Sequence, residues 1–199
     1  MAASLNGLII LVILFFCLSL QSASSPAPAP APSPYNLLEF TCDKTNDYPV
    51  CMKILKSNPQ TASASNPLDL ARAALNLAMA DTSIAREQIT ALSRSKKTQL
   101  GLRKPIERCI QWYDSVVEDF NVSTRELVED PMSANYDAGV AGIQAYYCEN
   151  GFVSAQLQVP VEIASLNEKL WSFSRIAYAV TDSKTTPRVV SYISWCSSF

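Results

Sequence analysis

Apolar and small residues recur in steps of three and four along four long segments of the chain. The first carries Leu68, Ala71, Leu75, Ala78, Thr82, Ala85, Ile89 and Leu92. The second carries Leu102, Ile106, Cys109, Tyr113, Val116 and Phe120, and the third carries Ala134, Ala138, Ala141, Ala145, Cys148 and Phe152. The fourth carries Ile163, Leu166, Leu170, Phe173, Ala177 and Val180. Each row places one apolar stripe on one face of a helix. Because the four stripes can be buried only against one another, the pattern predicts an all-α fold, an up-and-down four-helix bundle.

Capping and breaking residues predict where these helices begin and end. Asn66 before Pro67 is typical of a helix start, since Asn caps the first turn and Pro tolerates its first position. The second helix is expected to start near residues 101–104 and to end near Val128. Asp130-Pro131 indicates a turn, and the third helix is expected from Ser133, as its N-cap, to about Ser154.

The bundle is expected over residues 66–181, preceded by a hairpin of two short helices over 35–58, on either side of Pro49. Together these segments form one expected domain, 35–181, because the length suits a single core. Residues 182–199 form a C-terminal tail, and the loose alternation of apolar and polar positions over 188–199 does not assign it to an element.

The first 34 residues differ in composition from the rest. Residues 1–24 combine an apolar run with small residues near Ser24, which is typical of a cleaved secretory signal peptide. Residues 25–34 alternate Pro with Ala or Ser and favour an extended polyproline II linker. We therefore expect a protein secreted to the extracellular space, with no membrane association after cleavage.

Export into an oxidising compartment favours disulfides between the cysteines that remain. Cys109 and Cys148 lie in the stripes of two neighbouring helices and can crosslink them if their Cβ atoms approach to about 4 Å. Cys42 and Cys51 form a second, local candidate pair. Because the count after loss of Cys17 is odd, Cys196 is expected to keep an unpaired thiol.

Composition excludes several classes of function. The chain has no histidine, which excludes Ser-His-Asp and Cys-His catalysis and the common His-based zinc sites. A net charge of −2 gives no basic surface for nucleic acid. The carboxylates around Asp119 and Glu126 could form a catalytic pair, but a solvated charged helix face is the favoured interpretation. We expect no catalytic residue, no metal and no cofactor.

The third helix has two further features. Gly139 and Gly142 predict an unusually close approach, either by a neighbouring helix, which we favour, or by a partner. Five aromatic residues lie off the stripes: Trp112, Tyr136, Tyr146, Tyr147 and Trp171. We favour the interpretation that they widen the core, and the alternative is a surface for a protein partner. On the second helix, Asn121-Val122-Ser123 is a sequon, which predicts a glycan at Asn121 in a secreted protein.

Several of these motifs resemble the plant inhibitors of pectin methylesterase and acid invertase. The resemblance rests on the signal peptide, on Cys42 to Cys51 with Tyr48-Pro49 between them, and on Cys109-Ile110-Gln111-Trp112-Tyr113. It also rests on Tyr147-Cys148-Glu149-Asn150-Gly151-Phe152, which is similar to the family's Thr-Cys-Glu-Asp-x-Phe signature with Tyr and Asn replacing Thr and Asp.

The resemblance implies a secreted, monomeric four-helix bundle of the cell wall, with Cys42 paired to Cys51 and Cys109 paired to Cys148. It implies an inhibitor that covers the substrate cleft of its target, and no activity as an enzyme. The expected target is a pectin methylesterase, bound 1:1, and the alternatives are a cell-wall or vacuolar acid invertase or a non-inhibitory extracellular binding bundle. The candidate contacts with the target are Pro131, Met132, Ser133, Tyr136 and Tyr147.

Overall fold

The computed structural model describes residues 34–182. The predicted signal peptide, almost all of the predicted linker, Cys17, Cys196 and the tail beyond Asp182 lie outside them. The described residues form seven helices and no strand. Three short ones come first: α2 (Pro34–Cys42), α3 (Tyr48–Ser57) and α4 (Pro59–Ala62). Four long ones follow: α5 (Pro67–Arg94), α6 (Leu100–Glu126), α7 (Pro131–Ser154) and α8 (Val161–Thr181). The fold is therefore all-α, as predicted.

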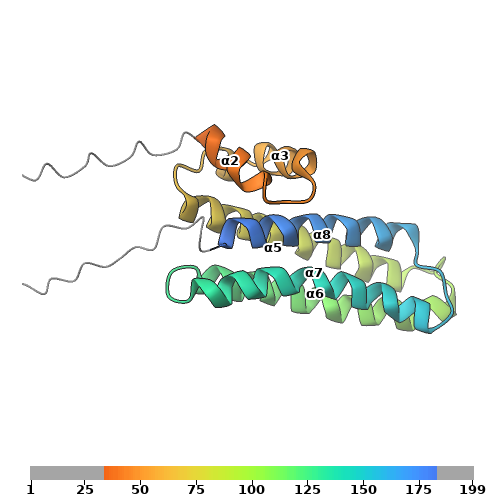
Figure 1. Ribbon diagram of the computed structural model, residues 1–199. Coiled ribbons are helices and arrows are strands. Elements are labelled where there is room, and N and C mark those ends of the chain that lie inside the picture. The colour runs from red at the N-terminus through yellow and green to blue at the C-terminus, as the bar shows by residue number, and fades with distance from the viewer. Residues whose placement is uncertain (1–33, 183–199) are drawn as a thin grey trace, which may run out of the picture. The chain divides into compact units, whose positions relative to one another are not determined.

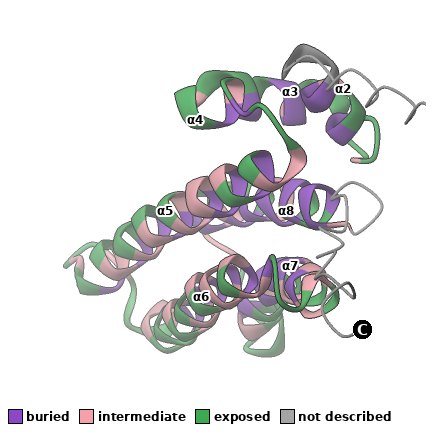
Figure 2. Cartoon of the chain, turned by 90° about the vertical axis from the view of Figure 1, so that its left-hand side faces the viewer, coloured by how far each residue is buried: buried purple, intermediate pink, exposed green. Residues whose placement is uncertain are grey.

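The long helices form an antiparallel bundle in which α6 packs against α5 and α7, and α8 packs against α7 and α5 (Figure 1). The predicted stripes line its core, and Figure 2 shows the buried positions turned toward the neighbouring helices. Every residue of the α7 stripe is at most 1% exposed. Half-buried residues occur near stripe ends, at Leu68, Leu92, Leu102 and Leu166. The period of the apolar positions thus predicts the bundle correctly.

Side-chain caps explain two of the helix starts. Asn66 accepts a hydrogen bond from the Asp69 backbone N–H at 2.9 Å, and Pro67 takes the first helical position, as expected. The expectation for α7 was wrong, because Asp130 and not Ser133 is the N-cap. The Asp130 carboxylate accepts hydrogen bonds from the Ser133 backbone N–H and hydroxyl, at 3.1 and 2.8 Å. The Asp-Pro pair therefore begins the helix instead of marking a separate turn.

The N-terminal hairpin consists of α2 and α3, joined by the Cys42–Cys51 disulfide with Cα atoms 5.5 Å apart. It lies against α8, and α4 packs against α5. The short helix α4 was not predicted, because four residues carry no helical period. Asn58 caps it and the fully buried Thr61 donates hydrogen bonds to the carbonyls of Leu55 and Asn58. These local bonds order the connection into the bundle.

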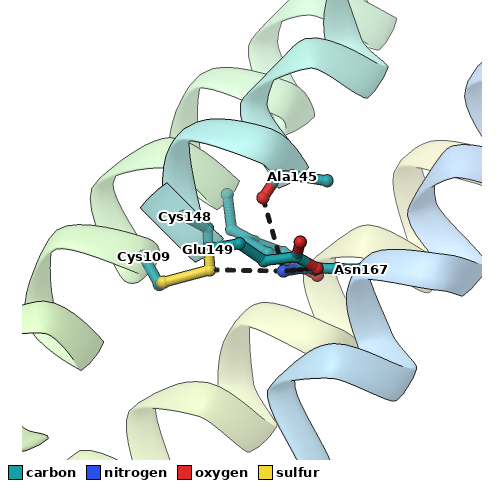
Figure 3. The surroundings of a disulfide bond; sticks show 6 residues. Cys109, Ala145, Cys148, Glu149 and Asn167 are labelled. Carbon is teal, nitrogen blue, oxygen red and sulfur yellow. Dashed lines mark hydrogen bonds between the residues drawn. A yellow bond between two sulfur atoms is a disulfide. The ribbon is translucent and has the colours of Figure 1, made fainter. Parts of the chain in front are cut away.

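The Cys109–Cys148 disulfide joins α6 to α7 within the core, with Cα atoms 4.5 Å apart. Beside it lies Asn167 of α8, a polar side chain that is fully buried (Figure 3). Its amide donates hydrogen bonds to the Ala145 carbonyl at 3.4 Å and to Glu149 at 3.1 Å. Its oxygen accepts one from the Tyr113 hydroxyl at 2.9 Å. Asn167 therefore connects three helices, and its hydrogen bonds offset the cost of burying a polar group.

The two glycines of α7 face α8, which confirms the internal packing we favoured. A Cβ atom added at Gly142 would lie 2.7 Å from the Ser174 Oγ, and one at Gly139 would lie 3.0 Å from the Tyr178 ring. The Gly142 backbone N–H donates to the Ser174 Oγ at 3.0 Å, and this hydroxyl donates to the Ala138 carbonyl at 2.9 Å. The absence of a side chain at Gly142 lets Ser174 reach the backbone of α7.

Candidate functional site

The side of α7 opposite its buried stripe is also apolar. Met132 is 81% exposed, Tyr136 69%, Ile143 40% and Tyr147 43%. The residues lie at helical spacing and, because the alanines of the stripe occupy the inner face, they point away from the core. We call these four residues the outer row of α7. The expectation that the tyrosines widen the core was therefore wrong for Tyr136 and Tyr147, and Tyr146 is exposed as well.

Aromatic contacts position one end of this row. The Tyr147 ring lies 5.0 Å from the ring of Trp112 on α6 and 5.8 Å from that of Tyr146, measured between centroids. Trp112 is half-buried against the core, and so is Trp171 of α8, which agrees with the core-widening interpretation for the two tryptophans. These ring contacts restrict the Tyr147 side chain, which lowers the conformational entropy that it loses on contact with a partner.

The other end of the row is held by the start of α7. Hydrogen bonds from the Ser133 backbone N–H, then from its hydroxyl, lower the pKa of Asp130, so this cap stays ionised. The cap fixes Pro131 and Ser133, both half-exposed, and leaves Met132 projecting between them. The structure thus brings the predicted loop residues and Tyr136 together on consecutive turns of one helix, with Tyr147 further along the same row.

Acidic and amide side chains line the contact between α6 and α7. Asp119 and Glu126 of α6 are half-buried, and Asp137 of α7 is half-buried as well. Burial is the main cause that raises the pKa of Asp119 to about 6, while a hydrogen bond from Gln144 opposes the shift. Burial, then the charges of Asp137 and Asp130, raises the pKa of Glu126. The interpretation as a solvated face was therefore wrong for Asp119 and Glu126, because both lie in a helix contact.

Two further features were expected from the sequence. Asn121 is half-exposed within α6, and its amide donates a hydrogen bond to Glu118 at 3.1 Å. Its glycosylation stays a prediction. Among residues 34–182, no group of three His, Cys, Asp or Glu side chains could hold a metal ion. Within the same range, no helix is both long enough and apolar enough to span a membrane.

The described residues combine a four-helix bundle and two disulfides with a buried polar centre and an exposed aromatic face on α7. The particular family follows from comparison with known proteins. Residues 36–180 match the model of the plant invertase/pectin methylesterase inhibitor family, and the chain belongs to that family. The resemblance expected from the motifs is thereby confirmed, and the family's members are inhibitors and not enzymes.

Individual relatives are distant. The chain is 22% identical over 147 residues to the cell wall / vacuolar inhibitor of fructosidase 1 of Arabidopsis thaliana, covering 73% of this chain and 67% of that protein. The fold is similar to that of a mutant form of a pectin methylesterase inhibitor from Arabidopsis. The TM-score is 0.62 at 19% identity, covering 74% of this chain and 95% of that one. The structure of a pectin methylesterase inhibitor from Arabidopsis thaliana gives a TM-score of 0.52 at 18% identity, covering 72% of this chain and 93% of that one. These likenesses show the same fold.

Proposed function

We propose that this protein is a secreted inhibitor of a pectin methylesterase, which it binds 1:1 through the outer row of α7. The observation that carries the proposal is the exposure of Met132, Tyr136, Ile143 and Tyr147 on one face of one helix. Large apolar side chains on a monomer surface are typical of interaction sites when they are contiguous. Tyrosine is also enriched among the residues that dominate binding energy in protein interfaces.

The start of α7 supports a pectin methylesterase over an invertase as the target. The family resemblance implies that invertase inhibitors share a Pro-Lys-Phe motif between the second and third bundle helices. This chain keeps the proline, Pro131, but has Met132 and Ser133 where that motif has Lys and Phe. The residue after the proline is therefore exposed and apolar instead of cationic.

An acid invertase is the second candidate, and the name of the fructosidase inhibitor from Arabidopsis thaliana favours it. A non-inhibitory extracellular binding bundle is the third. Secretion to the cell wall is part of the proposal for all three, and it is supported by the composition of residues 1–24. The net charge of −2 would favour association with a basic enzyme, so the complex is expected to weaken as salt rises.

Parallel inhibition assays of one pectin methylesterase and one acid invertase test the proposal. The purified protein should slow demethylesterification at micromolar concentration and leave sucrose hydrolysis unchanged. Inhibition of the invertase alone, or of neither enzyme, would overturn it. A binding bundle without inhibitory activity would be retained on cell-wall material and slow neither reaction.

A pair of variants tests the surface. Tyr136→Ala should weaken inhibition by roughly 30-fold, the effect of losing a central contact worth about 2 kcal/mol. Tyr48→Ala is the matched control, because Tyr48 is 37% exposed on α3 and lies outside the outer row. The two variants should melt within a few degrees of the native protein. Equal inhibition by both would show that the outer row is not the docking surface.

A further inference from the structure

The polar residues between α6 and α7 follow an antiparallel register. Asp119 and Glu126 are seven residues apart on α6, and Gln144 and Asp137 are seven apart on α7. The structure places them in opposite order: Gln144 lies beside Asp119, and Asp137 lies beside Glu126. Seven residues are two turns of a helix, so both pairs lie on the same edge of the contact. We call these four residues the acidic seam.

The acidic seam has more acceptors than donors. Three buried oxygens of the seam have no hydrogen-bond partner among the described residues: Asp119 Oδ2, Glu126 Oε2 and Gln144 Oε1. Gln144 is only 9% exposed, so solvent reaches little of its side chain. A buried acceptor without a donor costs about 1–3 kcal/mol. These three oxygens on one edge of a helix pair form a set of acceptors without a donor from the described residues.

The nearby cation does not supply this donor. Arg125 lowers the pKa of Glu126, but its guanidinium is bonded to Glu118 at 3.1 Å and its side chain is 62% exposed. Asp137 and Asp130 add negative charge beside Glu126, and Glu118 and Asp137 do so beside Asp119. Adjacent carboxylates of this kind need either a proton or an external cation to compensate their repulsion.

The acidic seam borders the proposed docking surface. Asp137 follows Tyr136 in the chain and Gln144 follows Ile143, so each seam residue of α7 lies next to a residue of the outer row, turned by 100° toward α6. A partner that covers the outer row would therefore also cover the acidic seam. The raised pKa values of Asp119 and Glu126 agree with carboxylates that a cation does not yet compensate.

We infer that the acidic seam is a binding site for one basic side chain of the target enzyme, an arginine or a lysine. A guanidinium presents several N–H donors in a plane and matches a set of carboxylate and amide oxygens better than an ammonium does. The inference rests on the proposed function, because it assumes that an enzyme docks on α7. The inference also specifies the surface of the target enzyme: a basic side chain next to an apolar patch.

The test compares Asp119→Asn/Glu126→Gln with a control of equal charge change, Glu87→Gln/Glu168→Gln. Glu87 and Glu168 are exposed on α5 and α8, which do not form the acidic seam. Inhibition constants are measured against the pectin methylesterase and the invertase, from low to high salt, and melting temperatures are measured alongside. The seam variant should bind roughly 10- to 100-fold more weakly, with a shallower salt dependence. Its melting temperature should be unchanged or higher, because the substitutions remove charge from a half-buried contact.

The outcomes separate this inference from the proposed function. An inhibition constant equal to that of the control variant would show that water alone satisfies the acidic seam, and would overturn the inference. A loss of inhibition together with a lower melting temperature would assign the seam to folding, and would overturn it too. If the native protein inhibits only the invertase, the target is not a pectin methylesterase. The inhibition constants of the seam variant and the control variant are then compared on the invertase. If it inhibits neither enzyme, both proposals fail.

Discussion

Gly139, Gly142 and Gly151 lie in α7 but have different neighbours. Replacing each of them by alanine therefore tests how closely α7 packs against α8. An alanine at Gly142 would place its Cβ 2.7 Å from the Ser174 Oγ, 2.9 Å from the Ser174 Cβ and 3.0 Å from a ring carbon of Trp171. Both neighbours belong to α8, and Ser174 is buried. At Gly151 nothing lies within 4 Å of the added atom.

The magnitudes follow from two opposing effects. Alanine is more favourable than glycine inside a helix by about 0.5–1 kcal/mol, and this gain applies at all three positions. Overpacking a close contact costs about 1–3 kcal/mol, and this cost applies fully at Gly142. Gly142→Ala should therefore lower the free energy of unfolding by about 1–2 kcal/mol, and Gly151→Ala should raise it by about 0.5–1. Gly139→Ala should lie between them, because the Tyr178 ring it meets is 54% exposed and can move.

Urea unfolding followed by circular dichroism measures the three free energies under one set of conditions. The reasoning depends on the order of the variants more than on any single value. If Gly142→Ala were as stable as Gly151→Ala, the close approach of α7 and α8 would not be the reason for glycine at position 142.

Three further predictions concern the core and the α6–α7 contact. Removing the Cys109–Cys148 bridge, whose cysteines are 39 residues apart, should cost about 4 kcal/mol in urea unfolding. Removing the bridge of the hairpin, with a separation of 9, should cost somewhat less than 3, and the reverse order would contradict the loop-entropy account. Because the pKa of Asp119 is raised from 3.8 to about 6, its ionisation should destabilise the fold as pH rises from about 4 to 6, by at most about 3 kcal/mol. Asp119→Asn should remove this loss of stability. The prediction would be refuted if the melting temperatures of the variant and the native protein changed in parallel from pH 4 to 8. Tyr113→Phe should cost about 1–3 kcal/mol in urea unfolding by leaving the buried Asn167 oxygen without its donor, and an unchanged midpoint would refute this.

The stripes could be predicted from the sequence because burial acts on every third or fourth residue of a long helix. Cys109 and Cys148 occupy such positions, and their pairing follows from the packing of neighbouring helices. The start of α7 could not be chosen by residue type alone, since both Asp130 and Ser133 are good capping residues. The structure selects Asp130 because Pro131 fits the position that follows a cap.

The orientation of the tyrosines and the acidic seam were harder to predict. The alanine stripe of α7 could be predicted as buried. Because the opposite face is apolar as well, periodicity did not say whether Tyr136 and Tyr147 widen the core or face outward. The acidic seam resembles an ordinary charged face in the sequence, because burial of Asp119 and Glu126 depends on the register between α6 and α7. A seven-residue spacing of polar positions beside the stripe was the available signal.

The division of α7 into an inner face of small residues and an outer face of large ones has a consequence for how such an inhibitor can acquire new specificity. The inner face is held by alanines and by the Gly142–Ser174 contact, whereas Met132 and Tyr136 make no part of the core. With the outer row as the proposed docking surface, substitutions there should alter recognition with little cost to folding. Exchange of the outer row between family members would then be the direct way to transfer target choice.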